Sequence, residues 1–496
     1  MRASAVRRLD GLPTHRLGVR LNRLQRSAMF LSPMLLVGTS TILLPSVSDD
    51  PAIWLGIILI CAITSLPLTA AGLRGKIDVL EPIILVNAGY WLYFAYAPIV
   101  DLLSGNDTFF DVRFVPMLPL GLLCAALGLL SMTIGYYCSA GPSLATALPT
   151  PSVRERSAVT YASALLLATV VLFGAYLRSS PLSWAELLSL GQMGSSDAMW
   201  SEGHAVSALT NYLKSTIECF VPAFMVLLGY STSRRKLLIP LFIAILLIYT
   251  TLGFRYRVLV LAMAPAVYWY LRTQRRPTAP HIASAAVVGF LIVGGIGALR
   301  SAFRSGQNVE STDLGRSFVQ FNSSLAIYQP FLITLTAFPS RHDFLWGTSF
   351  LYVAYQPIPR ALWPNKPPSP QQEIVRAAFG SEDPVKSGVA FPNIAEFYVN
   401  FGLPGVVALM FVFGAFMRTV YEYMRLNHDN TWALIIYAIA LPFFVQLISR
   451  GYFVQTFTES VFLLGPLAVP YLRRRHRRAP GGASGRIYSS PFAFRD

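Results

Sequence analysis

The stretch AIWLGIILICAITSLPLTAAGL, residues 52–73, is apolar over its whole length and contains no charged side chain. An α-helix rises about 1.5 Å per residue, so roughly 20 apolar residues span the ~30 Å hydrocarbon core of a membrane. Similar segments recur from residue 28 to residue 472, and 54% of the 496 residues are hydrophobic while only 13% are charged. A soluble protein carries about 25% charged residues. The sequence therefore predicts an all-α, polytopic integral membrane protein.

Basic residues in the connections predict how these helices are oriented. We count about twelve spans, and a cytoplasmic N-terminus makes every second connection cytoplasmic. Five of the six connections on that side are clearly basic, as the positive-inside rule requires. Both termini are therefore expected in the cytoplasm. The predicted spans cover residues 28–46, 52–73, 79–102, 114–138, 158–177, 208–230, 237–253, 257–271, 282–299, 402–420, 431–448 and 453–472.

Outside the predicted spans, the chain divides into two tails and one large loop. Residues 1–27 form a basic cytoplasmic tail that we expect to be retained, since no signal-peptide cleavage site is evident. Residues 28–472 form the transmembrane domain, with a large extracytoplasmic loop at 300–401 between the ninth and tenth spans. Residues 473–496 form a second basic cytoplasmic tail. The four cysteines lie in or beside apolar segments and predict neither a disulfide framework nor a metal site.

Cationic side chains also occur on the outer side of this topology, where the insertion bias disfavours them in short connections. GFRYR, residues 253–257, lies between the seventh and eighth spans, and SRGY, residues 449–452, lies between the last two. Snorkelling to lipid phosphates is one explanation. The other is a pocket for an anionic ligand, because the arginine fork binds phosphate oxygens in bidentate fashion. The candidate cations are Arg255, Arg257, Arg300, Arg304, Arg360, Lys366, Arg376 and Arg450.

The return of the large loop to the membrane carries the best candidate for a general base. In GVAFPNIAEFYVNFGLPG, residues 388–405, the positions Asn393, Glu396 and Asn400 share one face of a predicted helix. A partly desolvated carboxylate at Glu396 can accept a proton from a substrate hydroxyl. The two asparagines are candidate substrate-binding residues. An ordinary interfacial glutamate paired with an arginine is the alternative interpretation of Glu396.

Other titratable residues give weaker candidates. His342 lies in the large loop and is a second catalytic candidate. Glu459 lies inside the last predicted span, where a charge is costly, and we expect it to pair with an arginine such as Arg450. The sequence contains no glycine-rich nucleotide cradle and no His-x-x-x-His zinc spacing. We therefore expect neither a cofactor nor a metal.

Two stretches of the C-terminal half resemble a known family. GTSFLYVAYQPIPRALWPNKP, residues 347–367, and PNIAEFYVNFGLPGVV, residues 392–407, resemble the Wzy-type oligosaccharide repeat-unit polymerases of bacteria. Members of that family often show an iPR.lWp.KP segment, followed by an acidic residue and NFG..G at the start of the next span. The turn GFRYR is similar to their Gly-x-Arg element. About twelve spans with one large periplasmic loop also match the family's topology.

The resemblance implies a GT-C-like membrane glycosyltransferase of the bacterial inner membrane. Such an enzyme joins undecaprenyl-diphosphate-linked oligosaccharide repeat units on the periplasmic face, building O-antigen, capsule or exopolysaccharide and releasing undecaprenyl diphosphate. By this resemblance Arg255, Arg257, Arg360 and Lys366 hold the diphosphates, and Glu396 activates the acceptor hydroxyl. The implied partners are the lipid-linked oligosaccharide, the lipid bilayer and a chain-length regulator, with no nucleic acid.

Three other functions remain open at this point. An O-antigen ligase has the same fold, but ligases are expected to show a histidine in a motif near HN..L, where this chain has PNIAEF. A lipid-linked oligosaccharide flippase or other transporter usually has short loops and repeat symmetry between its halves, and neither is seen here. A non-enzymatic membrane scaffold would not need cations against the insertion bias.

Overall fold

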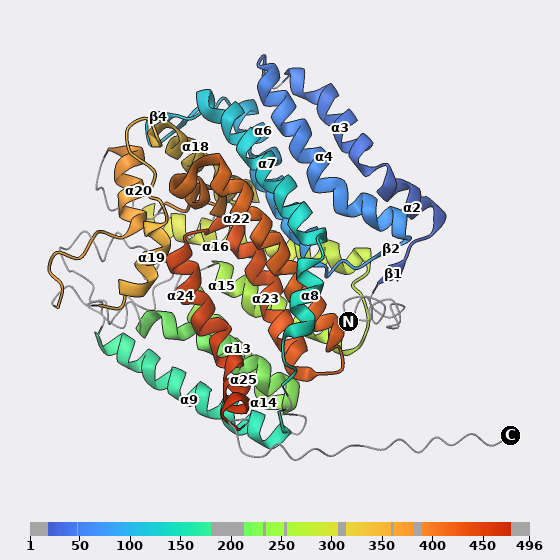
Figure 1. Ribbon diagram of the computed structural model, residues 1–496, viewed down its shortest axis with the longest axis vertical. Helices are drawn as coiled ribbons and strands as arrows, with labels where there is room; N and C mark the ends of the chain where they lie inside the picture. Colours follow the sequence, from blue (N-terminus) through green and yellow to red (C-terminus); the bar gives the residue numbers. More distant parts are fainter. Residues whose placement is uncertain are drawn as a thin grey trace, which may run out of the picture.

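The computed structural model describes residues 18–46, 48–151, 153–179, 213–231, 235–251, 255–305, 314–358, 362–380 and 389–477. Most of this part of the chain is helical (Figure 1). Two short antiparallel pairs complete it: β1 (Val19–Arg20) with β2 (Lys76–Ile77), and β3 (Thr108–Phe109) with β4 (Val112–Arg113). The first pair fixes the start of the described chain beside the end of the first long helix.

The helices follow the apolar segments closely. They are α2 (Arg23–Phe30), α3 (Ser32–Leu43), α4 (Pro51–Arg74), α5 (Pro82–Trp91), α6 (Ala97–Leu103), α7 (Leu118–Tyr137), α8 (Ala140–Ala147), α9 (Glu155–Ser179), α13 (Phe220–Tyr230), α14 (Arg235–Thr251), α15 (Arg255–Arg272), α16 (Ala279–Ser305), α17 (Leu314–Leu325), α18 (Tyr328–Ala337), α19 (Thr348–Tyr355), α20 (Pro370–Phe379), α22 (Asn393–Leu426), α23 (Thr431–Ser449), α24 (Phe453–Leu463) and α25 (Gly465–Arg477). Short turns η2 (Leu44–Ser46), η4 (Val115–Met117) and η5 (Thr216–Cys219) and the π-helix η3 (Leu92–Tyr96) join some of them.

Seven helical segments of the described chain are long and apolar enough to cross a membrane. Three shorter apolar helices lie on other predicted spans, within α3, α14 and α16. The multi-pass membrane class is confirmed by these segments, and the count of twelve crossings stays a prediction. The seven segments are Pro51–Arg74, Pro82–Leu103, Val115–Tyr137, Glu155–Ser179, Leu213–Tyr230, Asn393–Leu426 and Thr431–Ser449.

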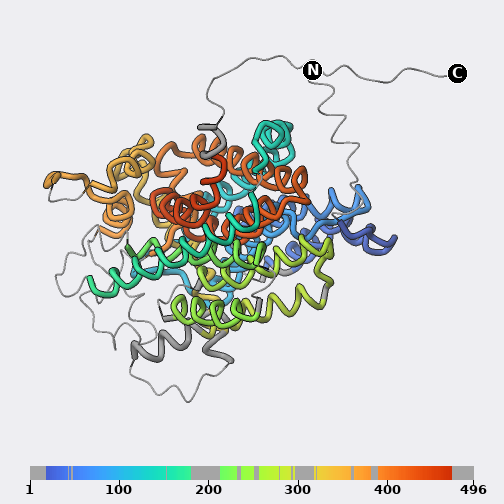
Figure 2. Tube along the Cα trace, turned by 90° about the horizontal axis from the view of Figure 1, so that it is seen from below, coloured from blue at the N-terminus to red at the C-terminus, as the bar shows by residue number. Residues whose placement is uncertain are grey.

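Two hydrophobic clusters form the interior of the bundle. The first unites α4, α5, α7, α18 and the first half of α22. The second unites α9, α13, α14 and α15. Helix α23 contributes to both, with Phe444 and Ile448 in the first cluster and Trp432 and Tyr437 in the second. Figure 2 shows the green helices of the second cluster beside the orange and red α22–α24. The C-terminal helices therefore join the two clusters.

One end of the bundle is rich in paired charges, and we call it the basic end. It brings together residues 18–21, 75–81, 149–154, 272–276 and 418–430, which are distant in sequence. Buried Asp78 pairs with Arg276 (Nε to Oδ1, 2.9 Å) and accepts a hydrogen bond from Tyr421. Arg418 bridges Glu81 and Glu422 at 3.1 and 2.5 Å. These contacts join the segment before α5, the connection between α15 and α16, and the second half of α22 at the same end of the bundle.

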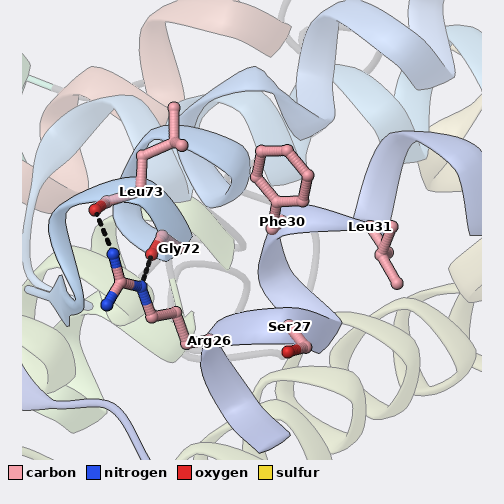
Figure 3. A pocket seen from close by; sticks show the side chains of 6 residues that line it. All are labelled: Arg26, Ser27, Phe30, Leu31, Gly72 and Leu73. Carbon is pink, nitrogen blue, oxygen red and sulfur yellow. Dashed lines mark hydrogen bonds between the residues drawn. The ribbon is translucent and has the colours of Figure 1, made fainter. Parts of the chain in front are cut away.

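Helix α2 also lies at the basic end, and Figure 3 shows how it is attached to α4. The Arg26 guanidinium donates to the carbonyl oxygens of Gly72 and Leu73 at 2.9 and 3.0 Å, which caps the last turn of α4. A Cβ at Gly72 would lie 2.8 Å from the Phe30 nitrogen, so the two backbones touch. These residues, together with Ser27 and Leu31, line a shallow pocket. Its one cation, Arg26, already donates its hydrogen bonds to the end of α4.

The segment predicted as a large loop, 300–401, contains packed helices. Helix α16 continues to Ser305, six residues past the predicted end of its span. Helix α18 is buried along most of its length, and Leu332 fills the space over Gly121 of α7, where a Cβ would lie 2.0 Å from its Cδ2. Helix α20 buries one face against α18. This part of the chain is therefore built into the bundle, at the end opposite the basic end.

Candidate functional site

Helix α22 begins at Asn393, nine residues before the predicted span, so the three predicted polar positions lie in its first two turns. They are buried, with exposures of 5% for Asn393, 1% for Glu396 and 0% for Asn400. The helix bends after them, because Gly402 has φ 64° and ψ −155°, a conformation that favours glycine. The shared helical face is as the spacing predicts, but it faces protein instead of the membrane interface.

The Glu396 carboxylate accepts two hydrogen bonds from the protein. The Ser349 hydroxyl donates to Oε1 at 2.6 Å, and the backbone N–H of Phe453 donates to Oε2 at 2.5 Å. Phe453 is the first residue of α24, so the negative charge lies at a helix N-terminus, where it is stabilised. Two carboxylate oxygens offer about four lone pairs, so acceptor capacity remains. No arginine of the described chain pairs with Glu396, which contradicts the interpretation as an arginine-paired interfacial glutamate.

The two asparagines hold neighbouring segments against α22. The Asn400 amide donates to Ser349 Oγ at 2.7 Å, and its Oδ1 accepts from the Gly347 N–H at 3.0 Å. Asn393 Oδ1 accepts from the Tyr90 hydroxyl of α5 at 2.7 Å. Both side chains therefore position the surroundings of Glu396, and their predicted contact with substrate stays a prediction.

A tight turn between α23 and α24, residues 449–453, packs directly on the start of α22. The Gly451 N–H donates to the Phe391 carbonyl at 2.9 Å. A Cβ at Gly451 would lie 2.0 Å from both the nitrogen and the Cα of Asn393, so only glycine fits. This contact places Arg450 and the Phe453 amide, three residues apart, on either side of the glycine.

Arg450 is a half-buried cation whose guanidinium lies over the ring of Tyr256, 5.0 Å from its centroid. Within the described chain its guanidinium makes no hydrogen bond or ion pair, so its donors are available for a ligand. The predicted pairing of Glu459 with Arg450 is therefore wrong. Glu459 instead accepts from Tyr256, Gln446 and Gln455 at 3.2, 2.6 and 3.0 Å. Neutral donors satisfy this buried carboxylate, and it reaches Arg450 only through Tyr256.

Arg257 follows Tyr256 on α15, and it is 5% exposed. Its guanidinium forms a buried ion pair with Glu218 of η5 and lies 5.8 Å from the centroid of the Tyr256 ring. A buried arginine that already has a carboxylate partner is less suited to a diphosphate than Arg450 is. Glu218, Tyr256 and Ser349 were not among the predicted site residues. Polar side chains in otherwise apolar segments were the signal that could have identified them.

Lys366 is 7% exposed and closes the PIPRALWPNKP segment on itself. Its ammonium donates to the carbonyl oxygens of Gln356 and Ile358 at 2.7 and 3.0 Å and lies 5.3 Å from the centroid of the Tyr352 ring. The side chain therefore shapes the segment that carries position 360.

The remaining candidates are less informative. His342 is exposed and contacts the ring of Phe338, and Arg376 lies on the exposed face of α20. Within the described residues, neither side chain contacts Glu396. Arg360 lies outside the described residues, and so do the side chains of three arginines in helices. Those three are Arg255 in α15 and Arg300 and Arg304 in α16. That Arg255 and Arg360 converge with Arg257, as shared binding of the diphosphates requires, stays a prediction.

Together these residues form a polar site between the two hydrophobic clusters. It offers a carboxylate, an arginine with available donors, hydroxyls and amides, which suits proton acceptance and anion binding. In the described part of the chain, no group of three or more His, Cys, Asp or Glu side chains could hold a metal ion.

Comparison with known proteins identifies a family. Curated proteins give no match, and solved structures give none. The family described as O-antigen polysaccharide polymerase Wzy matches residues 29–360, about two thirds of the chain. The match includes Arg257 and Ser349, ends at Arg360, and leaves Glu396 and Arg450 beyond it. Because the match runs from α3 to α19 and covers more than half of the chain, the chain belongs to the Wzy family of O-antigen polysaccharide polymerases.

Proposed function

We propose that this polymerase joins undecaprenyl-diphosphate-linked oligosaccharide repeat units at the periplasmic face of the inner membrane. The observation that carries the proposal is the turn at 449–453. It holds Arg450, with its donors available, close in sequence to the amide that binds Glu396. Glycosyl transfer from a diphosphate requires an anion-binding group and a proton acceptor. The turn carries the first, Arg450, and binds the second, Glu396, through the Phe453 amide.

The reaction has one bond-forming and one bond-breaking event. The acceptor sugar hydroxyl of the incoming repeat unit attacks the anomeric carbon of the growing chain, forming a glycosidic C–O bond. The bond from that carbon to the diphosphate oxygen breaks, and undecaprenyl diphosphate leaves with the electron pair. The hydroxyl proton passes to the Glu396 carboxylate, and Arg450 stabilises the negative charge on the departing diphosphate. Because Glu396 is 1% exposed, the incoming hydroxyl must displace neighbouring side chains to reach it.

The distribution of charge supports a periplasmic site. The basic end carries arginines and lysines in its connections, among them Lys76, Arg154 and Arg275, as expected for a cytoplasmic surface. Glu396 and Arg450 lie at the other end, for which the positive-inside rule favours a periplasmic position. Both termini then face the cytoplasm. A periplasmic chain-length regulator would meet the protein on the same side as the site.

The experiment replaces Glu396 with glutamine in a strain that lacks the chromosomal copy. This change keeps the shape of the side chain and its contact with Phe453 but removes the base. We expect glycans of core plus one repeat unit, with normal protein level, since flipping and ligation are intact. Glu422→Gln is the matched control: a buried glutamate of the same helix at the basic end, 2% exposed. It should lower stability and leave chain length per folded protein unchanged.

Wild-type chain length in Glu396→Gln would show that the carboxylate is structural. The deletion strain itself separates the related functions. Loss of a polymerase leaves single exported units, loss of a ligase leaves long chains on undecaprenyl diphosphate, and loss of a flippase leaves single units inside the cell.

A further inference from the structure

Tyr452 is a buried tyrosine whose hydroxyl has no hydrogen-bond partner among the described residues. The residue is 5% exposed, and its ring packs edge-on against Phe391 with centroids 5.4 Å apart. The hydroxyl oxygen is fully shielded and makes no hydrogen bond with any described side chain or backbone group. Burying an unsatisfied hydroxyl is costly, so such groups in native proteins usually have a function or an absent partner.

Several other buried tyrosines of the described chain have a hydrogen-bond acceptor for their hydroxyl. The hydroxyls of Tyr90, Tyr136, Tyr249, Tyr328 and Tyr437 donate to Asn393, Glu81, the Ile217 carbonyl, Asp101 and the Leu80 carbonyl, respectively. Tyrosines whose role is structural therefore have a hydrogen-bond acceptor in this fold. Tyr452 differs from them in position as well, since it lies in the turn that carries Arg450.

Its surroundings keep the hydroxyl protonated. Burial, together with the nearby negative charge of Glu396, holds the pKa of the Tyr452 hydroxyl well above its usual range. The next residue, Phe453, donates its N–H to Glu396, and Gly451 on the other side is pressed against Asn393. The group is therefore a fixed donor beside the proposed base, and it lacks an acceptor.

We propose that Tyr452 is a substrate-binding residue whose hydroxyl donates a hydrogen bond to an oxygen of the acceptor sugar. The inference rests on the proposed function and adds a recognition contact for the incoming repeat unit. The sugar oxygen supplies the acceptor that the fold omits, next to the hydroxyl that gives its proton to Glu396. A pyranose carries several hydroxyl and ether oxygens that can accept this bond, whereas a lipid hydrocarbon chain carries none.

The test is Tyr452→Phe in the purified full-length protein, assayed with undecaprenyl-diphosphate-linked repeat units. The variant should unfold at the same or a higher temperature than wild type, because an unsatisfied group is removed. Its KM for the incoming unit should rise about tenfold, the typical effect of one hydrogen bond. Tyr437→Phe is the matched control, because its hydroxyl donates to the Leu80 carbonyl near the basic end. That variant should unfold at a lower temperature with an unchanged KM.

Three results would overturn the proposal. An unchanged KM and an unchanged unfolding temperature in Tyr452→Phe mean that the hydroxyl does not bind the substrate. A lower unfolding temperature together with an unchanged KM in the folded fraction means that it has a structural partner. If wild type fails to polymerise the lipid-linked units at all, the proposed function fails first, and this is seen before any variant is compared.

Discussion

Replacing Gly451 with alanine tests the turn on which the proposed site depends. The added Cβ would lie 2.0 Å from the nitrogen and the Cα of Asn393, whereas ordinary contact begins near 3.4 Å. Both atoms belong to the backbone at the start of α22, so neither side can yield by rotating a side chain. The turn must therefore move away from α22 by more than an ångström.

The energetic cost follows from the contacts that this movement breaks. Overpacking of this kind costs about 1–3 kcal/mol. Loss of the hydrogen bond from Gly451 to Phe391 adds about 0.5–1.5 kcal/mol, and loss of the charge-assisted bond from Phe453 to Glu396 adds about 1.5–3 kcal/mol. The three losses share one displacement, so they overlap, and we expect roughly 3–6 kcal/mol. That is a large part of the ~5–15 kcal/mol that typically stabilises a folded protein.

The assay measures two quantities on each variant. Thermal unfolding of the detergent-purified protein reports stability, and gel separation of surface glycan from a complemented deletion strain reports chain length. We expect Gly451→Ala to unfold at a clearly lower temperature and to give only core plus one unit. Gly174→Ala on α9 is the control, because nothing lies within 4 Å of its added Cβ and the helix gains a better helix former. It should be neutral or slightly stabilising.

Wild-type stability and chain length in Gly451→Ala would refute the packing of the turn against Asn393. A normal unfolding temperature with short chains would show that the turn affects the reaction without contributing to stability. That result would contradict the magnitude worked out above.

Further predictions concern charge and orientation. Arg450→Ala should lower turnover about tenfold to a hundredfold, and Arg450→Lys should recover little of it, because lysine lacks the bidentate fork. Wild-type turnover in the alanine variant would contradict this. Asp78→Asn alone should lower the unfolding temperature more than Asp78→Asn combined with Arg276→Gln, since the single change leaves a buried cation without its carboxylate. Additive losses of stability from the two substitutions would argue against the ion pair. Ser340→Cys should react with an impermeant thiol reagent in intact spheroplasts, and Ser143→Cys only after lysis; the reverse pattern would place the site in the cytoplasm.

The membrane helices could be predicted from the sequence because hydrophobicity is a local property. Composition alone identifies a segment such as 52–73, and α4 covers it with one extra residue at each end. The sequence predicts a helical face at Asn393, Glu396 and Asn400 but starts the membrane span only at residue 402, because these polar residues interrupt the apolar run. Their burial depends on Ser349, Tyr90 and the 449–453 turn, which a span assignment does not see.

Partners of buried charges could not be predicted, because they depend on which helices face one another. Glu459 was expected beside Arg450, nine residues before it, yet it is satisfied by Tyr256 on α15 and by two glutamines. Arg257 was selected as a diphosphate ligand, and its carboxylate partner Glu218 lies 39 residues earlier in the chain. The family resemblance was recognised from residues 347–407, whereas the family match ends at residue 360.

The position of the 449–459 segment has a consequence for how the protein is made. During synthesis this segment follows every other part of the described site, and it supplies the amide for Glu396, Arg450 itself and one donor, Gln455, for Glu459. Until the 449–453 turn has packed on α22, Glu396 lacks one of its two donors in an apolar setting, where an unsatisfied carboxylate is costly. Packing of this turn thus completes both the stability and the proposed chemistry of the site. A chain arrested before residue 449 would be a target for membrane proteolysis and would carry no partial activity.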